Sequence, residues 1–327
     1  MKKILLVIST IALFISCDKA EPKTIKLNGP VFGTGYNIQY YSNKGINYQK
    51  EFDSLFNVIN TSLSTYIPTS DISKWNRNEP IDVDAHFMKV FNASKKIYEE
   101  SKGAFDPTIG NVVNAWNFGP DENKFLTDSL TIKELMQYVG FDKVIKTSDE
   151  FIRQEGTYLD FNAIAKGYGI DVIADFLQFQ GVTNYLVDIG GDMRTSGMNK
   201  EKNKGWTVGV EDPNFDGSQS YSKAITLENK GMATSGTYRK FKVDEDGNRY
   251  AHIINTKTGY PTKTNVLSVS VIAPNCMLAD GYATTFQAMG VEKTTEFIKI
   301  HPELQVYFIY LDKDNELQTL SLNNFPE

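Results

Sequence analysis

An α+β fold, with mixed sheets packed against helices, is predicted by the order of the apolar patterns along the chain. Strand-like and helix-like segments follow one another irregularly, and the strand-like segments 206–210 and 221–227 are spaced as a hairpin. No Gly-x-Gly-x-x-Gly pattern opens a strand–helix–strand unit, so a Rossmann-type dinucleotide site is excluded. A chain of 327 residues is long enough for a single large domain with two intimately packed halves.

The charge balance argues against nucleic acid as a partner. The formal net charge is −6, and no long basic run is present to follow a phosphate backbone. The apolar and aromatic content is ordinary for a globular protein, so a packed core is expected rather than disorder.

The first 27 residues are predicted to lie outside the fold. Lys2 and Lys3 precede an apolar stretch, residues 4–15, which is too short to span a bilayer and is typical of a signal peptide. Its end, Phe-Ile-Ser-Cys, resembles a bacterial lipobox. The resemblance implies removal of residues 1–16, a lipidated Cys17 with a polar tether over residues 17–27, and a domain over residues 28–327. An ordinary signal peptide followed by an unmodified cysteine is the alternative.

These features place the mature protein on the extracytoplasmic, periplasmic side of a bacterial membrane, held there by its lipid. Cys276 is the second of only two cysteines, so a chain lipidated at Cys17 forms no internal disulfide. We expect Cys276 to be a buried small apolar residue and the fold to be stable on its core alone.

The middle of the chain contains the most informative stretch. The alternation over residues 157–161 predicts a short strand, and a helical pattern then runs from residue 162 until Gly181, which would cap it. Asp160 would then lie at the end of a strand and Lys166 in the first turns of a helix. Such a junction directs free backbone N–H groups at an anion or a polar ring system. A plain connection with a capping Asp and a surface Lys is the alternative.

Other elements follow from the same patterns. Helical periodicity is present over residues 51–63 and 86–101, with a shorter helical insertion over 126–140. Residues 185–194 read as a strand that ends in a Gly-Gly turn, and residues 297–320 contain two further strands.

A pair of oxygen-bearing side chains near the C-terminus could hold a metal ion. Asp280 and Thr284 are four residues apart in a helical pattern, so they point to the same side. A carboxylate and a hydroxyl are hard ligands suited to Mg²⁺. The alternative is an Asp near a helix start and a Thr that bonds back to its own helix.

Several separated blocks, in matching order over about residues 28–315, resemble the ApbE family of FAD-dependent protein flavin transferases. The central block, Asp-Phe-Asn-Ala-Ile-Ala-Lys-Gly-Tyr at 160–168, is similar to the family's Asp-x-x-(Gly/Ala)-x-Ala-Lys-Gly-Tyr. The other blocks include Ser-Thr-Tyr at 64–66 with Ser-Asp-Ile-Ser-Lys-Trp-Asn at 70–76, Gly-Ala-Phe-Asp-Pro-Thr at 103–108, Asp-Ile-Gly-Gly-Asp-Met-Arg at 188–194, Ala-Thr-Ser-Gly-Thr-Tyr at 233–238, His-Ile-Ile-Asn-Thr-Lys-Thr-Gly-Tyr-Pro at 252–261 and Asp-Gly-Tyr-Ala-Thr at 280–284. Asn255 and Thr256 depart from the family's Asp-Pro; the Asn keeps a turn-forming amide, and the loss of Pro removes one constraint on the loop.

The resemblance implies a T-fold-like ApbE architecture with FAD in a cleft, and it assigns site residues. Contacts to FAD fall on Phe32, Tyr66, Ala104, Phe105, Asp106, Asp160, Lys166 and Ile254. The ligands of Mg²⁺ fall on the Ala163 carbonyl, Asp280 and Thr284.

A base is needed to take the proton of the acceptor, and His252 is the best candidate because it lies in a matched block. Catalytic roles are therefore expected for His252 and Asp280. The remaining histidines, His86 and His301, lie outside the matched blocks and are expected to be solvated surface residues.

The implied reaction is Mg²⁺-dependent transfer of FMN from FAD to a Thr or Ser hydroxyl of a target protein through a phosphoester, with release of AMP. The expected partners are FAD, the membrane, and an acceptor such as a subunit of a Na⁺-translocating or related membrane electron-transfer complex.

One alternative function is that of an Mg²⁺-dependent FAD pyrophosphatase, in which water replaces the acceptor. Another is a flavin-binding lipoprotein without chemistry, which would not need the pair formed by Asp280 and Thr284.

Overall fold

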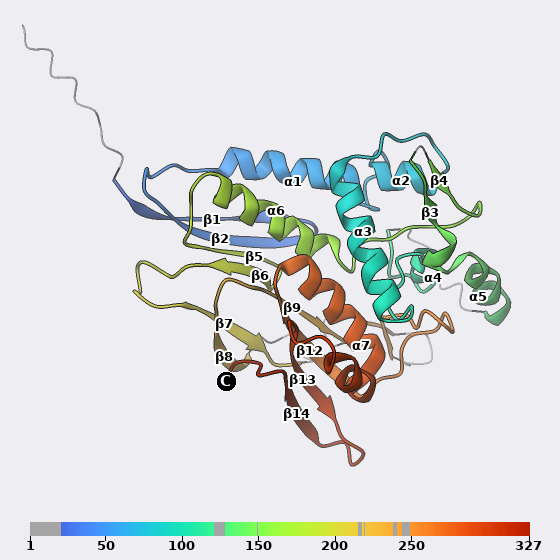
Figure 1. The fold of residues 1–327 in the computed structure, drawn as a ribbon. Coiled ribbons are helices and arrows are strands. Elements are labelled where there is room, and N and C mark those ends of the chain that lie inside the picture. Colours follow the sequence, from blue (N-terminus) through green and yellow to red (C-terminus); the bar gives the residue numbers. More distant parts are fainter. Residues whose placement is uncertain are drawn as a thin grey trace, which may run out of the picture.

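The fold is built on one large antiparallel sheet. The computed structural model describes residues 21–120, 128–148, 150–214, 218, 220–237, 241–243 and 249–327. The sheet has eight strands in the order β1-β2-β5-β6-β9-β12-β13-β14, and every neighbouring pair in it is antiparallel (Figure 1). Its strands are β1 (Lys23–Val31), β2 (Thr34–Ser42), β5 (Tyr185–Ile189), β6 (Asp192–Ser196), β9 (Gly231–Gly236), β12 (Val266–Ala273), β13 (Gln305–Leu311) and β14 (Leu317–Leu322).

Helices α6 (Ala165–Phe179) and α7 (Cys276–Ile298) cover one face of this sheet, with α7 against β9 and β12 and α6 against β5 and β6 (Figure 1). The other helices are α1 (Gln49–Leu63), α2 (Asp71–Asn76), α3 (Ala85–Glu100), α4 (Gly110–Ala115), α5 (Ser129–Leu135) and the 3₁₀ turns η1 (Met136–Tyr138) and η2 (Phe141–Lys143). The mixed α+β prediction is therefore confirmed, as are the helices predicted over 51–63 and 86–101.

Small two-stranded ribbons complete the fold. They are β3 (Ile145–Lys146) with β4 (Phe151–Ile152), β7 (Trp206–Glu211) with β8 (Tyr221–Leu227), and β10 (Phe241–Val243) with β11 (Arg249–Ala251). The β7–β8 ribbon is the hairpin predicted from the sequence. Its inward side chains, among them Val208 and Ile225, form a core with Met193, Met232 and Ile272 of the large sheet.

The helical face of the sheet carries two apolar cores, which correspond to the two packed halves that the sequence predicts. One joins α3, α7, β12 and β13, and the other joins α1, α6, β1, β2 and β5. Cys276 is fully buried in the second core, as expected for a small apolar residue.

Two boundaries expected from the sequence are wrong. Strand β1 begins at Lys23, so residues 23–27 belong to the sheet and not to a tether, and all of them pair with β2. Residues 157–161 are not a strand: only Tyr158 forms an isolated bridge, to Ile109. The alternation there arises because Leu159 and Phe161 are buried in the core, which an extended segment achieves without joining a sheet.

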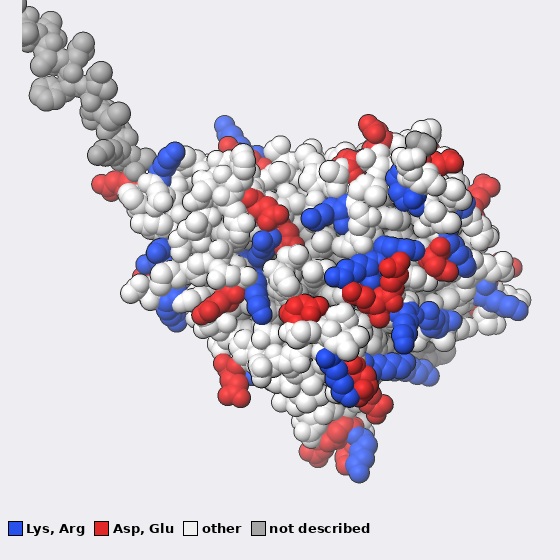
Figure 2. All heavy atoms as spheres, viewed as in Figure 1, with Lys and Arg blue, Asp and Glu red and all other residues white. Residues whose placement is uncertain are grey.

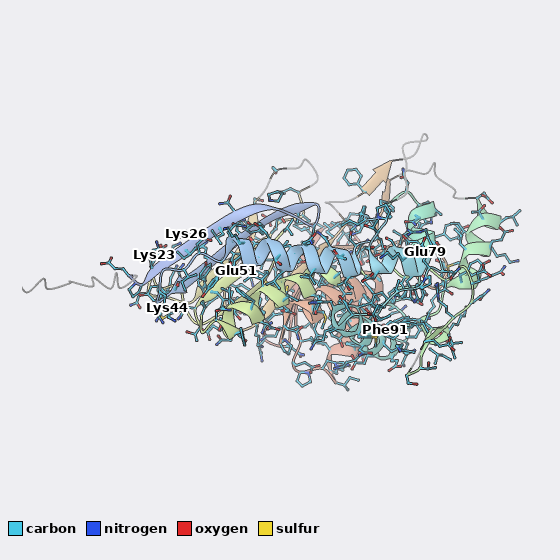
Figure 3. All side chains as sticks on the ribbon, turned by 90° about the horizontal axis from the view of Figure 1, so that it is seen from above. Lys23, Lys26, Lys44, Glu51, Glu79 and Phe91 are labelled. Carbon is cyan, nitrogen blue, oxygen red and sulfur yellow. The ribbon has the colours of Figure 1, made fainter. Side chains whose placement is uncertain are left out.

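The N-terminal end of the fold is marked by lysines. Figure 3 shows Lys23, Lys26 and Lys44 at the end of the molecule where β1 begins. The predicted signal peptide and Cys17 lie outside the described residues. Among the helices of the described part of the chain, none has the length and apolarity that crossing a bilayer requires.

Charges of both signs are interspersed over the face that carries α3 and α7 (Figure 2). Several form pairs along one helix, such as Lys95 with Glu99, Lys96 with Glu100 and Lys299 with Glu296. Pairs of this spacing on an exposed surface stabilise a helix by only about 0.3–0.5 kcal/mol each.

A buried carboxylate ties α6, α7 and β6 together. Asp171 of α6 accepts hydrogen bonds of 2.9 Å from the backbone N–H groups of Cys276 and Met277, the first two residues of α7. It also pairs with Arg194 of β6 at 3.0 Å. The side chain of Asn275 caps the same helix by accepting from Leu278 N–H. Burial raises the pKa of Asp171, against the opposing effects of Arg194 and of the two N–H groups.

We predict that Asp171→Asn lowers the free energy of unfolding by about 3 kcal/mol, because it leaves a buried guanidinium short of its carboxylate and removes charge from a helix N-terminus. Asp175→Asn is the matched control, since Asp175 pairs with the same Arg194 at 2.9 Å but its side chain is 66% exposed. The control should change the free energy by at most about 0.5 kcal/mol. Urea unfolding would measure both, and equal losses would contradict this account of the junction.

Candidate site at the junction of α6 and α7

The loop before α6 places Asp160 and Lys166. The backbone N–H of Asp160 donates to the carbonyl of Pro107 at 2.8 Å, and a turn over residues 162–164 then leads into α6. Helix α6 ends at Phe179, and Gly181 takes the left-handed conformation (φ 76°) that the sequence predicts for it. Lys166 lies in the first turn of α6, as expected.

Lys166 is not a simple surface lysine. Its ammonium lies 2.7 Å from the carboxylate of Asp192, which is only 1% exposed, and Asp192 also accepts from Thr234 N–H at 3.1 Å. Burial alone would lower the pKa of Lys166, but the charges of Asp192 and Asp280 outweigh it and raise that pKa. Asp192 was missed in the sequence, where the Gly-Gly-Asp turn at 190–192 indicated only a change of direction.

Asp280 faces the same junction from α7. It is buried, and its Oδ2 accepts a hydrogen bond of 2.9 Å from the backbone N–H of Gly167, next to Lys166. Burial, and then the charge of Asp192, raise the pKa of Asp280, while Lys166 and the Gly167 N–H oppose the change. The approach of the helices is close: a Cβ on Gly167 would lie 2.4 Å from the carbonyl oxygen of Cys276.

Thr284 lies one turn beyond Asp280 on α7 and differs from its neighbour. Thr285 donates its hydroxyl to the carbonyl of Gly281 at 2.7 Å, the bond back to its own helix that a buried Thr commonly makes. Among the described residues, the Thr284 hydroxyl makes no such bond, and it is partly exposed. The alternative of a back-bonded Thr therefore holds for Thr285 and not for Thr284.

These oxygen atoms fit a hard divalent cation. One carboxylate, one hydroxyl without a partner on its own helix, and the carbonyl of Ala163 in the turn before α6 offer the donor chemistry of Mg²⁺. The described residues contain no cluster of three or more His, Cys, Asp or Glu side chains around one metal position. Any ion at this junction would thus depend on backbone and hydroxyl oxygens and on water, as Mg²⁺ commonly does.

Aromatic side chains flank the junction. Tyr66 is 57% exposed, and desolvation and the charge of Asp160 raise the pKa of its hydroxyl. Phe32 packs edge-on against Phe56, with 5.6 Å between ring centroids, and its ring would lie 2.6 Å from a Cβ on Gly169 of α6. The exposed ring of Tyr66 and the ring of Phe32, which packs against α6, suit a flat aromatic ligand.

The loop at 103–108 is held by a buried aromatic ring and by hydrogen bonds to the carboxylate of Asp106. Phe105 is buried in the core, and Ala104 is partly exposed. The Oδ1 of Asp106 accepts from the N–H of Thr108 at 2.9 Å and from its hydroxyl at 2.6 Å, and its Oδ2 accepts from Phe141 N–H at 3.3 Å. Both carboxylate oxygens are therefore engaged inside the fold.

The segment at 252–261 lies against that loop. The hydroxyl of Thr256 donates to the carbonyl of Gly103 at 2.5 Å, and Asn255 Oδ1 accepts from the N–H groups of Lys257 and Thr258 at 2.9 and 3.1 Å. The Asn amide thus forms the turn, as expected, and the Thr adds an attachment that Pro could not make.

His252 and Ile254 lie in the same segment. Ile254 is buried and forms an isolated bridge with Pro261. His252 is partly exposed, with its ring 6.3 Å from that of Phe118.

The expectation that His86 and His301 are solvated surface residues is wrong. The Nδ1 of His86 lies 2.8 Å from the hydroxyl of Tyr168, because the start of α3 packs against α6. The His301 ring stacks on Phe297 with centroids 4.2 Å apart, and its Nδ1 lies 3.1 Å from Glu303.

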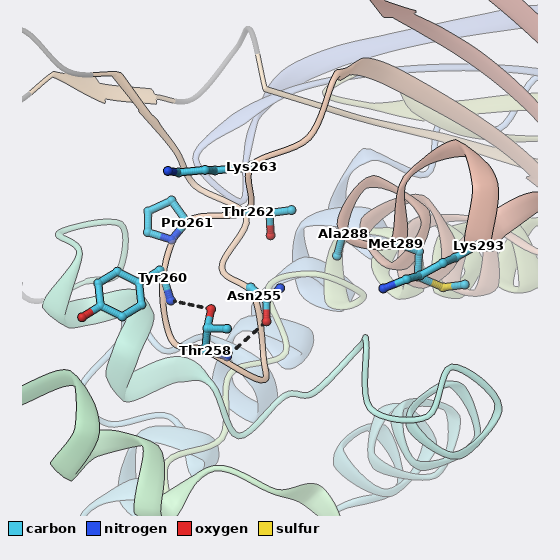
Figure 4. A pocket seen from close by; sticks show the side chains of 9 residues that line it. All are labelled: Asn255, Thr258, Tyr260, Pro261, Thr262, Lys263, Ala288, Met289 and Lys293. Atoms are coloured by element: carbon cyan, nitrogen blue, oxygen red, sulfur yellow. Dashed lines mark hydrogen bonds between the residues drawn. The ribbon is translucent and has the colours of Figure 1, made fainter. Parts of the chain in front are cut away.

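Two cavities are lined in part by the segment at 252–261, and neither is lined by Lys166, Asp192 or Asp280. One of about 550 Å³ separates Tyr260 and Lys263 from Met289 and Lys293 of α7 (Figure 4). The other, of about 570 Å³, is lined by Ala104, Thr256 and the last turns of α7. Both include Ala288, one helical turn beyond Thr284, so they continue the face of α7 that carries Asp280 and Thr284.

The fold and this junction can be compared with known proteins. Residues 32–308 match the ApbE family. The chain is 35% identical to the FAD:protein FMN transferase of Haemophilus influenzae, over 100% of this chain and 98% of that protein. The solved structure of the flavin transferase ApbE from Vibrio cholerae superimposes with a TM-score of 0.82 at 32% identity, covering 92% of this chain and 97% of that one. The apo form of flavinyl transferase ApbE from Pseudomonas stutzeri gives 0.81 at 27% identity, covering 92% and 95%.

The antiparallel sheet, the two helices that meet at a Lys–carboxylate junction and the similarity to these relatives identify an enzyme of the flavin transferase class. The chain belongs to the ApbE family.

We predict that Gly167→Ala lowers the free energy of unfolding by about 2 kcal/mol, because its methyl group would overlap the backbone of α7. Helix propensity alone predicts the opposite sign, a gain of up to about 1 kcal/mol. Gly35→Ala is the control, since a Cβ there would meet nothing closer than 3.6 Å. Thermal unfolding of both variants would decide, and an unchanged or raised Tm for Gly167→Ala would show that the helices do not meet this closely.

Proposed function

We propose that the protein transfers the FMN part of FAD to a Thr or Ser hydroxyl of an acceptor protein, in an Mg²⁺-dependent reaction that releases AMP. The observation that carries the proposal is the pairing of Asp280 and Thr284 on one face of α7. Asp280 accepts a hydrogen bond from the first turn of α6, and the Thr284 hydroxyl makes no bond to its own helix. A flavin-storage protein would have no need of such a pair. The names of the relatives, FAD:protein FMN transferase, support the same reaction.

Asp280, Thr284 and the carbonyl of Ala163 would hold Mg²⁺. The ion would neutralise the pyrophosphate of FAD and the charge that develops on the departing AMP. Lys166 would add its positive charge from α6, held in place by Asp192 at 2.7 Å.

The flavin would lie against Phe32 and Tyr66, with Asp160 as its polar partner. Ala104, Phe105 and Asp106 would contact FAD chiefly through their backbone, because the Asp106 carboxylate is engaged with Thr108 and Phe141. Ile254 would likewise contribute backbone groups, since its side chain is buried.

The reaction is a displacement at phosphorus. The acceptor hydroxyl oxygen forms a bond to the FMN phosphorus, the bond from that phosphorus to the bridging oxygen breaks, and AMP leaves with the bridging oxygen. The hydroxyl proton passes to His252, which is partly exposed and so accessible to an incoming protein.

The direct test is mass spectrometry of a Thr-containing acceptor protein after incubation with the enzyme, FAD and Mg²⁺. A covalent FMN adduct on the acceptor, together with free AMP, is the expected result. Free FMN and AMP without an adduct would instead identify an FAD pyrophosphatase, and unchanged FAD would identify a flavin carrier.

We predict that Asp280→Ala still binds FAD, as followed by flavin fluorescence, but loses FMN transfer by a factor on the order of 10² or more. The carboxylate acts mainly on charge that develops in the transition state, so turnover suffers more than affinity. Thr284→Ala should be milder, because water can replace a neutral hydroxyl ligand.

Thr285→Ala is the matched control for Thr284→Ala. It removes a hydroxyl one position away that bonds to Gly281, so it should lower stability and leave the Mg²⁺ dependence of transfer unchanged. Transfer by Asp280→Ala at near the wild-type rate would overturn the metal assignment.

We also propose that the protein is a lipoprotein, anchored through Cys17 on the extracytoplasmic side of a bacterial membrane. The basic start of the chain, the apolar stretch after it and the lipobox-like residues before Cys17 support this. The acceptor would then be an extracytoplasmic part of a membrane electron-transfer complex, such as a Na⁺-translocating one.

We predict that Cys17→Ala releases the protein from the membrane fraction, or leaves its signal peptide uncleaved, without changing transfer by the purified domain. Fractionation and intact-mass measurement would follow this. A wild-type protein that keeps residues 1–16 in the mature membrane fraction would contradict it.

A further inference from the structure

The segment that carries Asp160 is held like a strand, although none of the strands in the described part of the chain lies beside it. On one side, Tyr158 bridges to Ile109, and the N–H of Asp160 donates to the carbonyl of Pro107. On the other side, the Asn76 amide contacts Leu159 twice. Asn76 Oδ1 accepts from Leu159 N–H at 2.8 Å, and Asn76 Nδ2 donates to the Leu159 carbonyl at 2.9 Å. One side chain thus satisfies both backbone groups of a residue distant in sequence, as a partner strand would.

The end of α2 is itself firmly attached to this segment. Asn76 is the last residue of α2, and beside it the ring of Trp75 supports the guanidinium of Arg153 at 3.3 Å from the ring centroid. Arg153 donates to the carbonyl of Trp75 and, at 2.9 Å, to that of Thr157. Figure 1 shows α2 next to β4, from which Arg153 follows. Helix α2 therefore holds the segment at Thr157 and at Leu159, directly before Asp160.

The same helix also fixes the loop that carries Tyr66. The hydroxyls of Ser70 and Ser73 donate to the carbonyl of Ser64 at 2.6 and 3.3 Å. From the loop that follows Asp160, Asn162 Nδ2 donates to the hydroxyl of Thr65, next to Tyr66, at 3.2 Å. Helix α2 thus connects the loop of Tyr66 with the loop of Asp160.

We infer that Asn76 is a positioning residue for the FAD site, whose amide sets the backbone at Leu159 and so aims the carboxylate of Asp160. The inference rests on the proposed function, in which Asp160 contacts the flavin. An amide is required because it offers a donor and an acceptor side by side. A carboxylate at this position would face the Leu159 carbonyl with a second acceptor.

Asn76→Ala should weaken FAD binding about tenfold, because the aim of one hydrogen-bonding carboxylate is lost. The matched control is Asn323→Ala. The Asn323 amide also clamps backbone, donating to the carbonyls of Ile298, His301 and Leu304 at 3.2, 3.1 and 3.0 Å, but it lies at the far end of α7. Both variants should lower Tm, and only Asn76→Ala should change the Kd for FAD by more than about twofold.

A double-mutant cycle separates positioning from general stability. If Asn76 acts through Asp160, adding Asn76→Ala to Asp160→Ala should weaken FAD binding by no more than about a further twofold. Should Asn76→Ala fail to fold, Asn76→Asp serves in the same cycle. It matches the Asn in size and keeps an acceptor for Leu159 N–H, but it lacks the donor.

The inference would be overturned by equal Kd values for FAD in Asn76→Ala and Asn323→Ala. It would also be overturned if the losses of FAD affinity caused by Asn76→Ala and Asp160→Ala added in full. In either case FMN transfer by the wild type would leave the proposed function intact. A wild-type protein that neither binds FAD nor transfers FMN would remove the proposed function itself.

Discussion

The contact between Asp171 and the N-terminus of α7 is the constraint on which the rest of the site depends. It joins the first residues of α7 to the middle of α6, and Arg194 extends the same contact to β6. Once these elements are held together, Gly167 must approach the backbone of α7, and only a residue without a side chain can do so. Asp280, one turn into α7, is thereby brought against the first turn of α6.

The charges at this junction divide between two tasks. Asp192 pairs with Lys166 and holds its ammonium group in place, while Asp280 is a buried carboxylate with one backbone N–H as its hydrogen-bond partner. Two carboxylates and one ammonium leave an excess of negative charge at this junction, which a bound cation would offset. Burial and then the charge of Asp192 raise the pKa of Asp280, which reflects the same excess of negative charge.

Local patterns predicted the elements whose causes are local. The periodicity of residues 51–63 and 86–101 and the cap at Gly181 depend on near neighbours, and all were found where the sequence indicated. The α+β class followed from the irregular order of such elements. The segment 157–161 could not be assigned in this way, because an alternation of buried and exposed residues does not reveal whether the partner is a strand or a side chain.

The missed residues share a dependence on distant partners. Asn76 and Leu159 are 83 residues apart, and nothing near either one indicates the contact. In the sequence Asp192 is likewise only part of a turn, and its ion pair with Lys166 follows from the packing of β6 against α6. Asp106 shows the opposite case: its motif predicted a ligand contact, while its carboxylate proved to be occupied by the turn that the same motif encodes. The position of a polar residue within a motif therefore does not say whether its side chain or its backbone faces the ligand.

The early start of β1 limits how far the domain could move. Only five residues lie between Cys17 and Lys23, and at full extension the chain from one to the other spans only about 20 Å. If a lipid at Cys17 anchors the domain through so short a tether, the domain would diffuse to its acceptor in two dimensions, along the bilayer surface, and not through the surrounding volume. Confinement of this kind raises the effective concentration of any acceptor in the same membrane and makes sites that stand far above the bilayer hard to reach. The short tether would thus favour acceptor sites that lie close to the bilayer surface. This selectivity would not depend on any residue of the FAD site.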